Sequence, residues 1–156
     1  MKLLFKQRFF SWFDSYDVYD EQGNTLFTVE GKPSWGHRLH ILDSSGETIG
    51  AVKEVIFAFL PRFDLFVGDR CVGFIKKEFT FLKPKFSLDM NGWTVQGNLF
   101  EWDYYVADES GNVVATISKE IIRWTDTYSI DIADPSHALM VLMIVLAIDA
   151  EKCERS

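Results

Sequence analysis

The sequence predicts a mainly β protein in which about twelve antiparallel strands close into a barrel around one buried hydrophobic helix. Three observations support this fold class. Tight-turn signals recur at nearly even spacing, the segments between them alternate apolar and polar residues, and an unbroken apolar run follows the last of these segments. No linker or low-complexity tract divides the chain. We therefore expect a single domain over residues 1–156, with the barrel over about 2–132 and the helix over about 135–152.

The turns are marked by a repeated Asp-x-x-Gly pattern that contains Gly23, Gly46 and Gly111. Further tight turns are expected around Asp69 and around Gly92, which follows an Asn. Asn-Gly is the strongest short signal for a β-hairpin. The turn positions 23, 46, 69, 92 and 111 give a period of about 23 residues, or two strands per repeat.

The segments between the turns alternate in the way that a strand with one buried face requires. Pro33, Pro61 and Pro84 all fall between segments, where they interrupt no strand. We expect the many Phe residues and Trp93, Trp102 and Trp124 to face the core or to form cross-strand pairs. The expected strands are 2–10, 16–20, 25–30, 37–43, 47–57, 62–68, 71–80, 85–90, 93–98, 102–108, 112–122 and 127–132.

The apolar run Ala138–Ile148 has no polar face, so as a helix it must be surrounded by protein or by lipid. At about 17 Å it is too short for a hydrocarbon core of about 30 Å, which leaves the inside of the barrel. Its β-branched residues would also suit a strand, but its length and its Leu, Met and Ala content favour a helix. Asp134 supplies an N-cap and Pro135 a first helical residue, while Lys152 and Arg155 suit the C-terminal end.

The composition excludes several classes of function. A net charge of -7 disfavours nucleic-acid binding, which needs clustered Lys and Arg. Cys71 and Cys153 form no Cys-x-x-Cys motif, and we expect two free thiols in a reducing compartment. Lys6 and Arg8 interrupt a would-be signal peptide, and no segment is long enough to span a membrane. These features predict a cytoplasmic monomer.

Three features together resemble one known superfamily. They are the Asp-x-x-Gly turns, the Lys-Glu pairs at 53–54, 77–78 and 119–120, and the apolar run after Asp134-Pro135. Their order along almost the whole chain is similar to the tubby C-terminal-like superfamily and, within it, to the small LURP-one-related proteins, which are distantly similar to phospholipid scramblases. The resemblance implies a barrel around a central helix and no shared catalytic constellation. Because tubby domains bind phosphoinositide head groups through Lys and Arg, it also implies anionic lipid as a ligand.

The densest basic cluster lies around a Phe- and Leu-containing hairpin tip, where Lys76, Lys77, Lys83 and Lys85 are the candidate lipid-binding residues. Anionic head groups attract such clusters, and exposed aromatic residues could insert beside them. Arg62, at the equivalent point of the preceding repeat, would extend the cluster if the two strands are neighbours. The alternative is an ordinary solvated hairpin whose lysines discourage edge pairing.

Catalytic and metal-binding patterns are absent from the sequence. His37 and His40 are three apart in an expected strand and so point to opposite faces. Asp14, Asp17 and Asp20 lack the ligand spacing of a calcium loop. The central helix also fills the space that a ligand inside the barrel would need. We expect no enzymatic activity, no cofactor and no metal, but a binding module that acts as a protein-interaction or scaffolding domain through strand edges or loops. The alternative is weak binding of anionic phospholipid or phosphoinositide at a membrane surface.

Overall fold

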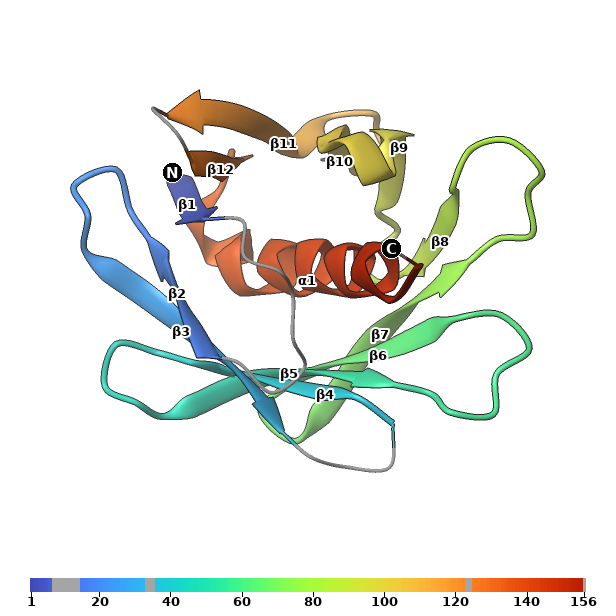
Figure 1. The fold of residues 1–156 in the computed structure, drawn as a ribbon, viewed down its shortest axis with the longest axis horizontal. Coiled ribbons are helices and arrows are strands. Elements are labelled where there is room, and N and C mark those ends of the chain that lie inside the picture. The colour runs from blue at the N-terminus through green and yellow to red at the C-terminus, as the bar shows by residue number, and fades with distance from the viewer. Residues whose placement is uncertain (7–14, 33–35, 123–124, 156) are drawn as a thin grey trace.

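In a computed structural model, which describes residues 1–6, 15–32, 36–122 and 125–155, a ring of twelve strands surrounds one long helix (Figure 1). All neighbouring strands are antiparallel. The strands are β1 (Lys2–Lys6), β2 (Ser15–Tyr19), β3 (Thr25–Lys32), β4 (Arg38–Leu42), β5 (Thr48–Glu54), β6 (Arg62–Val67), β7 (Arg70–Lys77), β8 (Phe86–Asp89), β9 (Thr94–Asn98), β10 (Asp103–Ala107), β11 (Val113–Ile122) and β12 (Thr125–Ile132).

The order of the strands around the ring is β8-β7-β6-β5-β4-β3-β2-β1-β12-β11-β10-β9. Almost every strand pairs with its neighbour in the chain, and β1 pairs with β12, with Leu3 opposite Ile130. The predicted barrel is therefore confirmed with one difference. No ladder joins β8 to β9, so the barrel is nearly closed, with one open seam between these two strands.

The predicted Asp-x-x-Gly turns share one hydrogen-bond pattern. Asp20 accepts from the backbone N–H groups two and four residues later, at 2.9 and 2.8 Å, and Asp43 and Asp108 repeat this arrangement. Gly23 and its counterparts have φ between 84° and 87°, which favours glycine. Hydrogen bonds from the Asn24 side chain and from the backbone lower the pKa of Asp20. These turns therefore keep their negative charge.

The helix α1 (Ala138–Arg155) follows a short 3-10 turn, η2 (Pro135–His137), and crosses the middle of the ring (Figure 1). Asp134 caps the 3-10 turn, accepting from Ser136 N and Oγ at 3.0 and 2.9 Å. Every side chain from Val141 to Ala147 has no exposed surface. The prediction of a helix buried on all sides is thus confirmed from Val141 to Ile148, whereas Leu139 and Met140 near the beginning of the helix are only partly buried. Among the described residues, no helix has the length and hydrophobicity to span a bilayer.

The aromatic residues divide into two groups. Trp93 and Trp102 are buried as predicted, and the Trp102 ring stacks on Tyr128 with centroids 3.4 Å apart. The prediction that the Phe residues face the core is wrong for four of them, Phe57, Phe59, Phe79 and Phe81, which are exposed on loops rather than placed in strands. Trp124, Asp14, the expected extension of the first strand to residue 10 and the Cys153 side chain lie outside the described residues.

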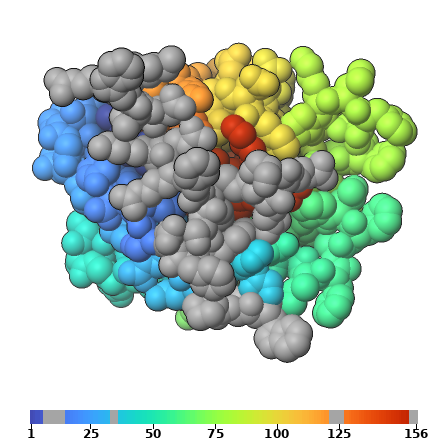
Figure 2. All heavy atoms as spheres, viewed as in Figure 1, coloured from blue at the N-terminus to red at the C-terminus, as the bar shows by residue number. Residues whose placement is uncertain are grey.

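The antiparallel topology gives the barrel two different ends. The turn end carries the tight turns, around residues 20–24, 43–47, 68–69, 90–93 and 108–112, and the beginning of α1. The loop end carries the longer connections 55–61 and 78–85 and the last turns of α1. Both connections project on the right of Figures 1 and 2, and they adjoin each other, because Leu60 and residues 77–84 line one shared hollow.

Candidate binding surface at the loop end

The strands β6 and β7 are neighbours, and Arg62 lies directly opposite Lys76. The condition for Arg62 to extend the basic cluster is therefore met. Its guanidinium is nevertheless engaged locally, because Nε lies 3.2 Å from Asp64 Oδ1 and the group sits 3.9 Å from the Phe74 ring centroid. Arg62 thus contributes less free positive charge to this surface than its position suggests.

Lys77 does not belong to the surface cluster. It is 5% exposed and its Nζ lies 3.1 Å from Oε1 of Glu151, which is 2% exposed and comes from α1. The Lys77 ammonium also lies 5.4 Å from the Phe100 ring centroid. Because successive side chains of a strand point to opposite faces, Lys76 is directed to solvent and Lys77 to the barrel interior. The sequence grouped the two as equivalent, and this grouping is wrong for Lys77.

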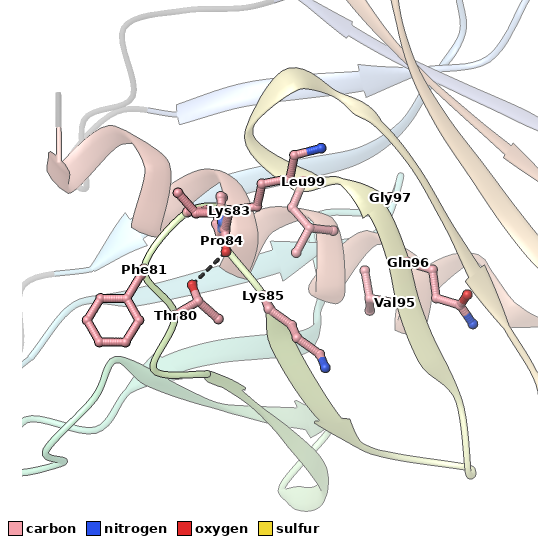
Figure 3. A pocket seen from close by; sticks show the side chains of 10 residues that line it. Thr80, Phe81, Lys83, Pro84, Lys85, Val95, Gln96, Gly97 and Leu99 are labelled. Atoms are coloured by element: carbon pink, nitrogen blue, oxygen red, sulfur yellow. Dashed lines mark hydrogen bonds between the residues drawn. The ribbon is translucent and has the colours of Figure 1, made fainter.

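Lys76, Lys83 and Lys85 remain as exposed lysines around the 78–85 loop. The loop is held by Thr80 Oγ1, which donates to the Lys83 carbonyl at 2.6 Å, and by Glu78 N, which donates to the Lys85 carbonyl at 2.7 Å. Lys83 Nζ lies 3.4 Å from Asn98 Oδ1, so this lysine leans toward β9. The three lysines therefore lie on or beside one loop, but Lys83 and Lys85 extend in different directions from it (Figure 3).

Beside these lysines lies a set of exposed apolar side chains that we call the apolar rim. The members on the 55–61 loop are Ile56, Phe57 and Phe59, and those on the 78–85 loop are Phe79, Phe81 and Leu82. Both Phe57 and Phe59 are 95% exposed, and Leu82 is 96% exposed.

The two loops that carry the apolar rim are anchored. The Phe79 and Phe81 rings contact edge to face with centroids 5.2 Å apart. Lys77 N donates to the Pro61 carbonyl at 2.8 Å and so ties the 55–61 loop to β7. The sequence had indicated the 78–85 half of the rim as a Phe- and Leu-containing hairpin tip, but not the 55–61 half, although Pro61 between two strands marks that loop in the same way as Pro84 marks the other.

The two ends of the barrel differ in charge. The turn end is strongly acidic, with Asp20, Glu21, Asp43, Glu47, Asp69, Asp89, Asp108, Glu109 and Asp134, and its described basic residues are Lys2 and Arg70. The loop end carries both signs and includes Lys32, Arg38, Lys53, Arg62, Lys76, Lys83, Lys85 and Lys152. Most of the net charge of -7 therefore lies away from the apolar rim.

Polar groups inside the loop end lie near the last turns of α1. Burial raises the pKa of Asp149 to about 7, and the nearby Lys152 opposes this shift. Burial also raises the pKa of Tyr104 well above its usual value, with a smaller contribution from Asp149. The Tyr104 hydroxyl is buried without a hydrogen-bond partner among the described residues.

The histidines show no metal-binding arrangement in the described part of the chain. His37 Nδ1 lies 2.7 Å from Glu54 Oε2. Burial, with help from Arg38, lowers the pKa of His40. No three His, Cys, Asp or Glu side chains of the described residues come together in a way that could hold a metal.

Comparison with known proteins agrees with this architecture. Residues 1–149 match the sequence model of a family described as LURP-one-related. The chain belongs to the LURP-one-related family. A relative from Bacillus subtilis (strain 168), described as uncharacterized protein YxjI, is 32% identical over 150 residues, which cover 96% of this chain and 92% of the relative. The resemblance expected from the turns and the apolar run is confirmed.

Proposed function

We propose that this LURP-one-related chain is a non-enzymatic binding module that docks on an anionic membrane surface through the apolar rim and the lysines beside it. The observation that carries the proposal is the rim itself. Phe57, Phe59, Phe81 and Leu82 are each at least 89% exposed, although large apolar side chains on a monomer usually bury most of their surface. Their place on adjoining loops lets them enter a surface together.

The energetics of the rim fit insertion at the boundary between head groups and acyl chains. Complete burial of a Phe or Leu side chain is worth about 1.5–3 kcal/mol, and partial insertion is worth correspondingly less. Several side chains entering at once would therefore give a useful affinity. Because they occupy loop tips, they can insert without unfolding any strand.

Electrostatics determine the orientation. Lys76, Lys83 and Lys85 would each gain about 1 kcal/mol near an anionic surface. The acidic turn end would be repelled and would face away from the membrane. The net charge of -7 also opposes association, so the affinity should be weak and should fall with added salt.

A protein-binding role for the same rim, the other function expected from the sequence, fits its composition less well. The centres of protein–protein interfaces are enriched in aromatic residues but depleted in lysine. Here Lys83 follows the tip residue Leu82 directly, and Lys85 lies two residues further on. Apolar tips bordered by lysines match the chemistry of an anionic bilayer, in which a polar, charged layer covers an apolar one.

The test is co-sedimentation with phosphatidylcholine vesicles, alone or containing phosphatidylserine or a phosphoinositide. Wild type is compared with an apolar variant, Phe57→Ser with Phe59→Ser and Phe81→Ser, and with a charge variant, Lys76→Glu with Lys83→Glu and Lys85→Glu. We expect wild type to pellet only with the anionic vesicles, and less so at high salt. Both variants should lose this binding.

Matched controls come from the turn end, where Val113→Ser and Arg70→Glu change an exposed apolar and an exposed basic residue. The controls should pellet like wild type, and all variants should melt near the wild-type temperature. Equal pelleting of wild type and both rim variants, or no pelleting of wild type with any vesicle, would rule out the proposal.

A further inference from the structure

The open seam of the barrel leaves two strand edges without partners. β8 and β9 follow each other in the chain and are joined by the turn 90–93, where Trp93 N donates to the Met90 carbonyl at 3.0 Å. They nevertheless stand at opposite ends of the strand order, and no ladder joins them. An unpaired strand edge is a template for an added strand.

The hydrogen-bond pattern between β7 and β8 shows which backbone groups of β8 face the seam. Glu78 N donates to the Lys85 carbonyl, which makes this a hydrogen-bonded position. Hydrogen-bonded positions recur every second residue in an antiparallel pair, so Ser87, opposite Lys76, also faces β7. The N–H and C=O groups of Phe86 and Leu88 therefore point away from β7 and toward β9.

A groove follows the seam. It comprises two adjoining hollows of about 700 and 660 Å³, which share Thr80, Lys85, Val95 and Gln96. Figure 3 shows Lys85 extending from the beginning of β8 into the space between the two strands, toward which Val95 of β9 also points. The wall of the groove thus offers apolar surface and an ammonium group beside unpaired backbone.

We infer that the seam accepts an extended segment of a partner protein, which adds as a strand antiparallel to β8 and alternates aliphatic with acidic residues. The backbone groups of Phe86 and Leu88 require donors and acceptors at the spacing of a strand, which a peptide backbone supplies and a lipid acyl chain does not. Aliphatic side chains would contact Val95 and Leu99, which line the groove. Acidic side chains would lie near Lys83 and Lys85, so the charges of the groove and the segment are complementary.

This site shares Lys83, Lys85 and part of the 78–85 loop with the membrane-docking surface, and Phe79, Phe81 and Leu82 of the apolar rim border its hollows. Strand addition also requires the backbone edge of β8, which membrane docking does not use. The two can therefore be tested by separate variants of the same folded chain.

The probe is a short fluorescein-labelled peptide of alternating Glu and Val, followed by fluorescence anisotropy. Two further peptides serve as comparisons: an analogue N-methylated on alternate residues, which cannot complete a ladder, and a Lys/Val peptide of opposite charge. We expect saturable binding of the Glu/Val peptide, with affinity lower by roughly tenfold or more for each comparison peptide, equivalent to about 1.4 kcal/mol.

The matched protein variants are Leu88→Pro and Leu88→Ala. Proline removes the N–H that faces the seam but leaves the bonds to β7, and it is tolerated on an edge strand. Leu88→Pro should weaken peptide binding roughly tenfold, about 1.4 kcal/mol, whereas Leu88→Ala, which keeps the N–H, should change it much less. Both should still pellet with anionic vesicles as wild type does.

Hydrogen exchange gives an independent readout. In the free protein the Leu88 amide should exchange faster than the Ser87 amide, and the Glu/Val peptide should slow it. The inference would be overturned by equal protection of the two amides in the free protein, by no binding of the Glu/Val peptide, or by equal binding of the N-methylated analogue.

Discussion

Replacement of Lys77 by Met is the sharpest test of how the helix is anchored in the barrel. The change keeps the length of the side chain but removes the ammonium 3.1 Å from Glu151 Oε1. Because Glu151 is 2% exposed, its carboxylate would be left buried without this charge partner. Breaking a buried pair in this way costs about 3–5 kcal/mol. At about 2–4 °C per kcal/mol for a chain of this size, the melting temperature should fall by roughly 6–20 °C.

Thermal unfolding followed by circular dichroism measures this effect, and neighbouring positions supply the controls. Lys76→Met alters the adjacent, outward-facing lysine and should change stability by about 0.5 kcal/mol or less. The double variant Lys77→Met with Glu151→Leu should be more stable than Lys77→Met alone, because no uncompensated charge remains. A Lys77→Met protein that melts with wild type, or a double variant no more stable than the single one, would refute the reasoning.

Two further predictions concern the helix. Leu142→Ala should lower the free energy of unfolding in urea by about 2–5 kcal/mol, because it leaves a cavity beside a fully buried position, whereas Val113→Ala at the surface should have little effect. A change at Leu142 no larger than that at Val113 would contradict the enclosed helix. Asp149 has a folded pKa of about 7, above an unfolded value of about 3.9, so the folded state binds its proton more tightly. Its contribution to stability should therefore fall as the pH rises from about 4 to about 7, and Asp149→Asn should flatten that decline; an unchanged pH profile would show that Asp149 is not the group responsible.

The architecture could be predicted from the sequence because the patterns that specify it each lie within a few neighbouring residues. Asp20, Asp43 and Asp108 each set a turn through hydrogen bonds within five residues, so a short pattern suffices to place them. The all-apolar surface of α1 likewise requires enclosure wherever it lies in the fold. The twelve strands, their alternation and the buried helix all follow from such short-range signals.

The binding surface could be predicted from the sequence only in part. Strict alternation along β7 already separates Lys76 from Lys77, so the wrong grouping could have been avoided. The exposure of Phe57 and Phe59 is harder to infer, because a nearby proline indicates a loop but not which side chains are exposed, and Phe in a β-rich chain is usually in the core. The open seam depends on how the twist and tilt of twelve strands accumulate around the ring, which no local pattern records.

The chain order of the barrel also bears on how it is synthesised. The helix that fills the core follows all twelve strands in the chain. β1 cannot pair with β12, in which Ile130 lies opposite Leu3, until β12 has been synthesised. At about 5–20 residues per second on the ribosome, the interval between synthesis of Leu3 and of Ile130 is roughly 6–25 s. During this time the inward faces of the early strands, such as Val29, Ile41 and Val52, have no helix to cover them. The nascent chain should therefore depend on holding chaperones until α1 emerges, and translation pauses before residue 138 should increase its aggregation.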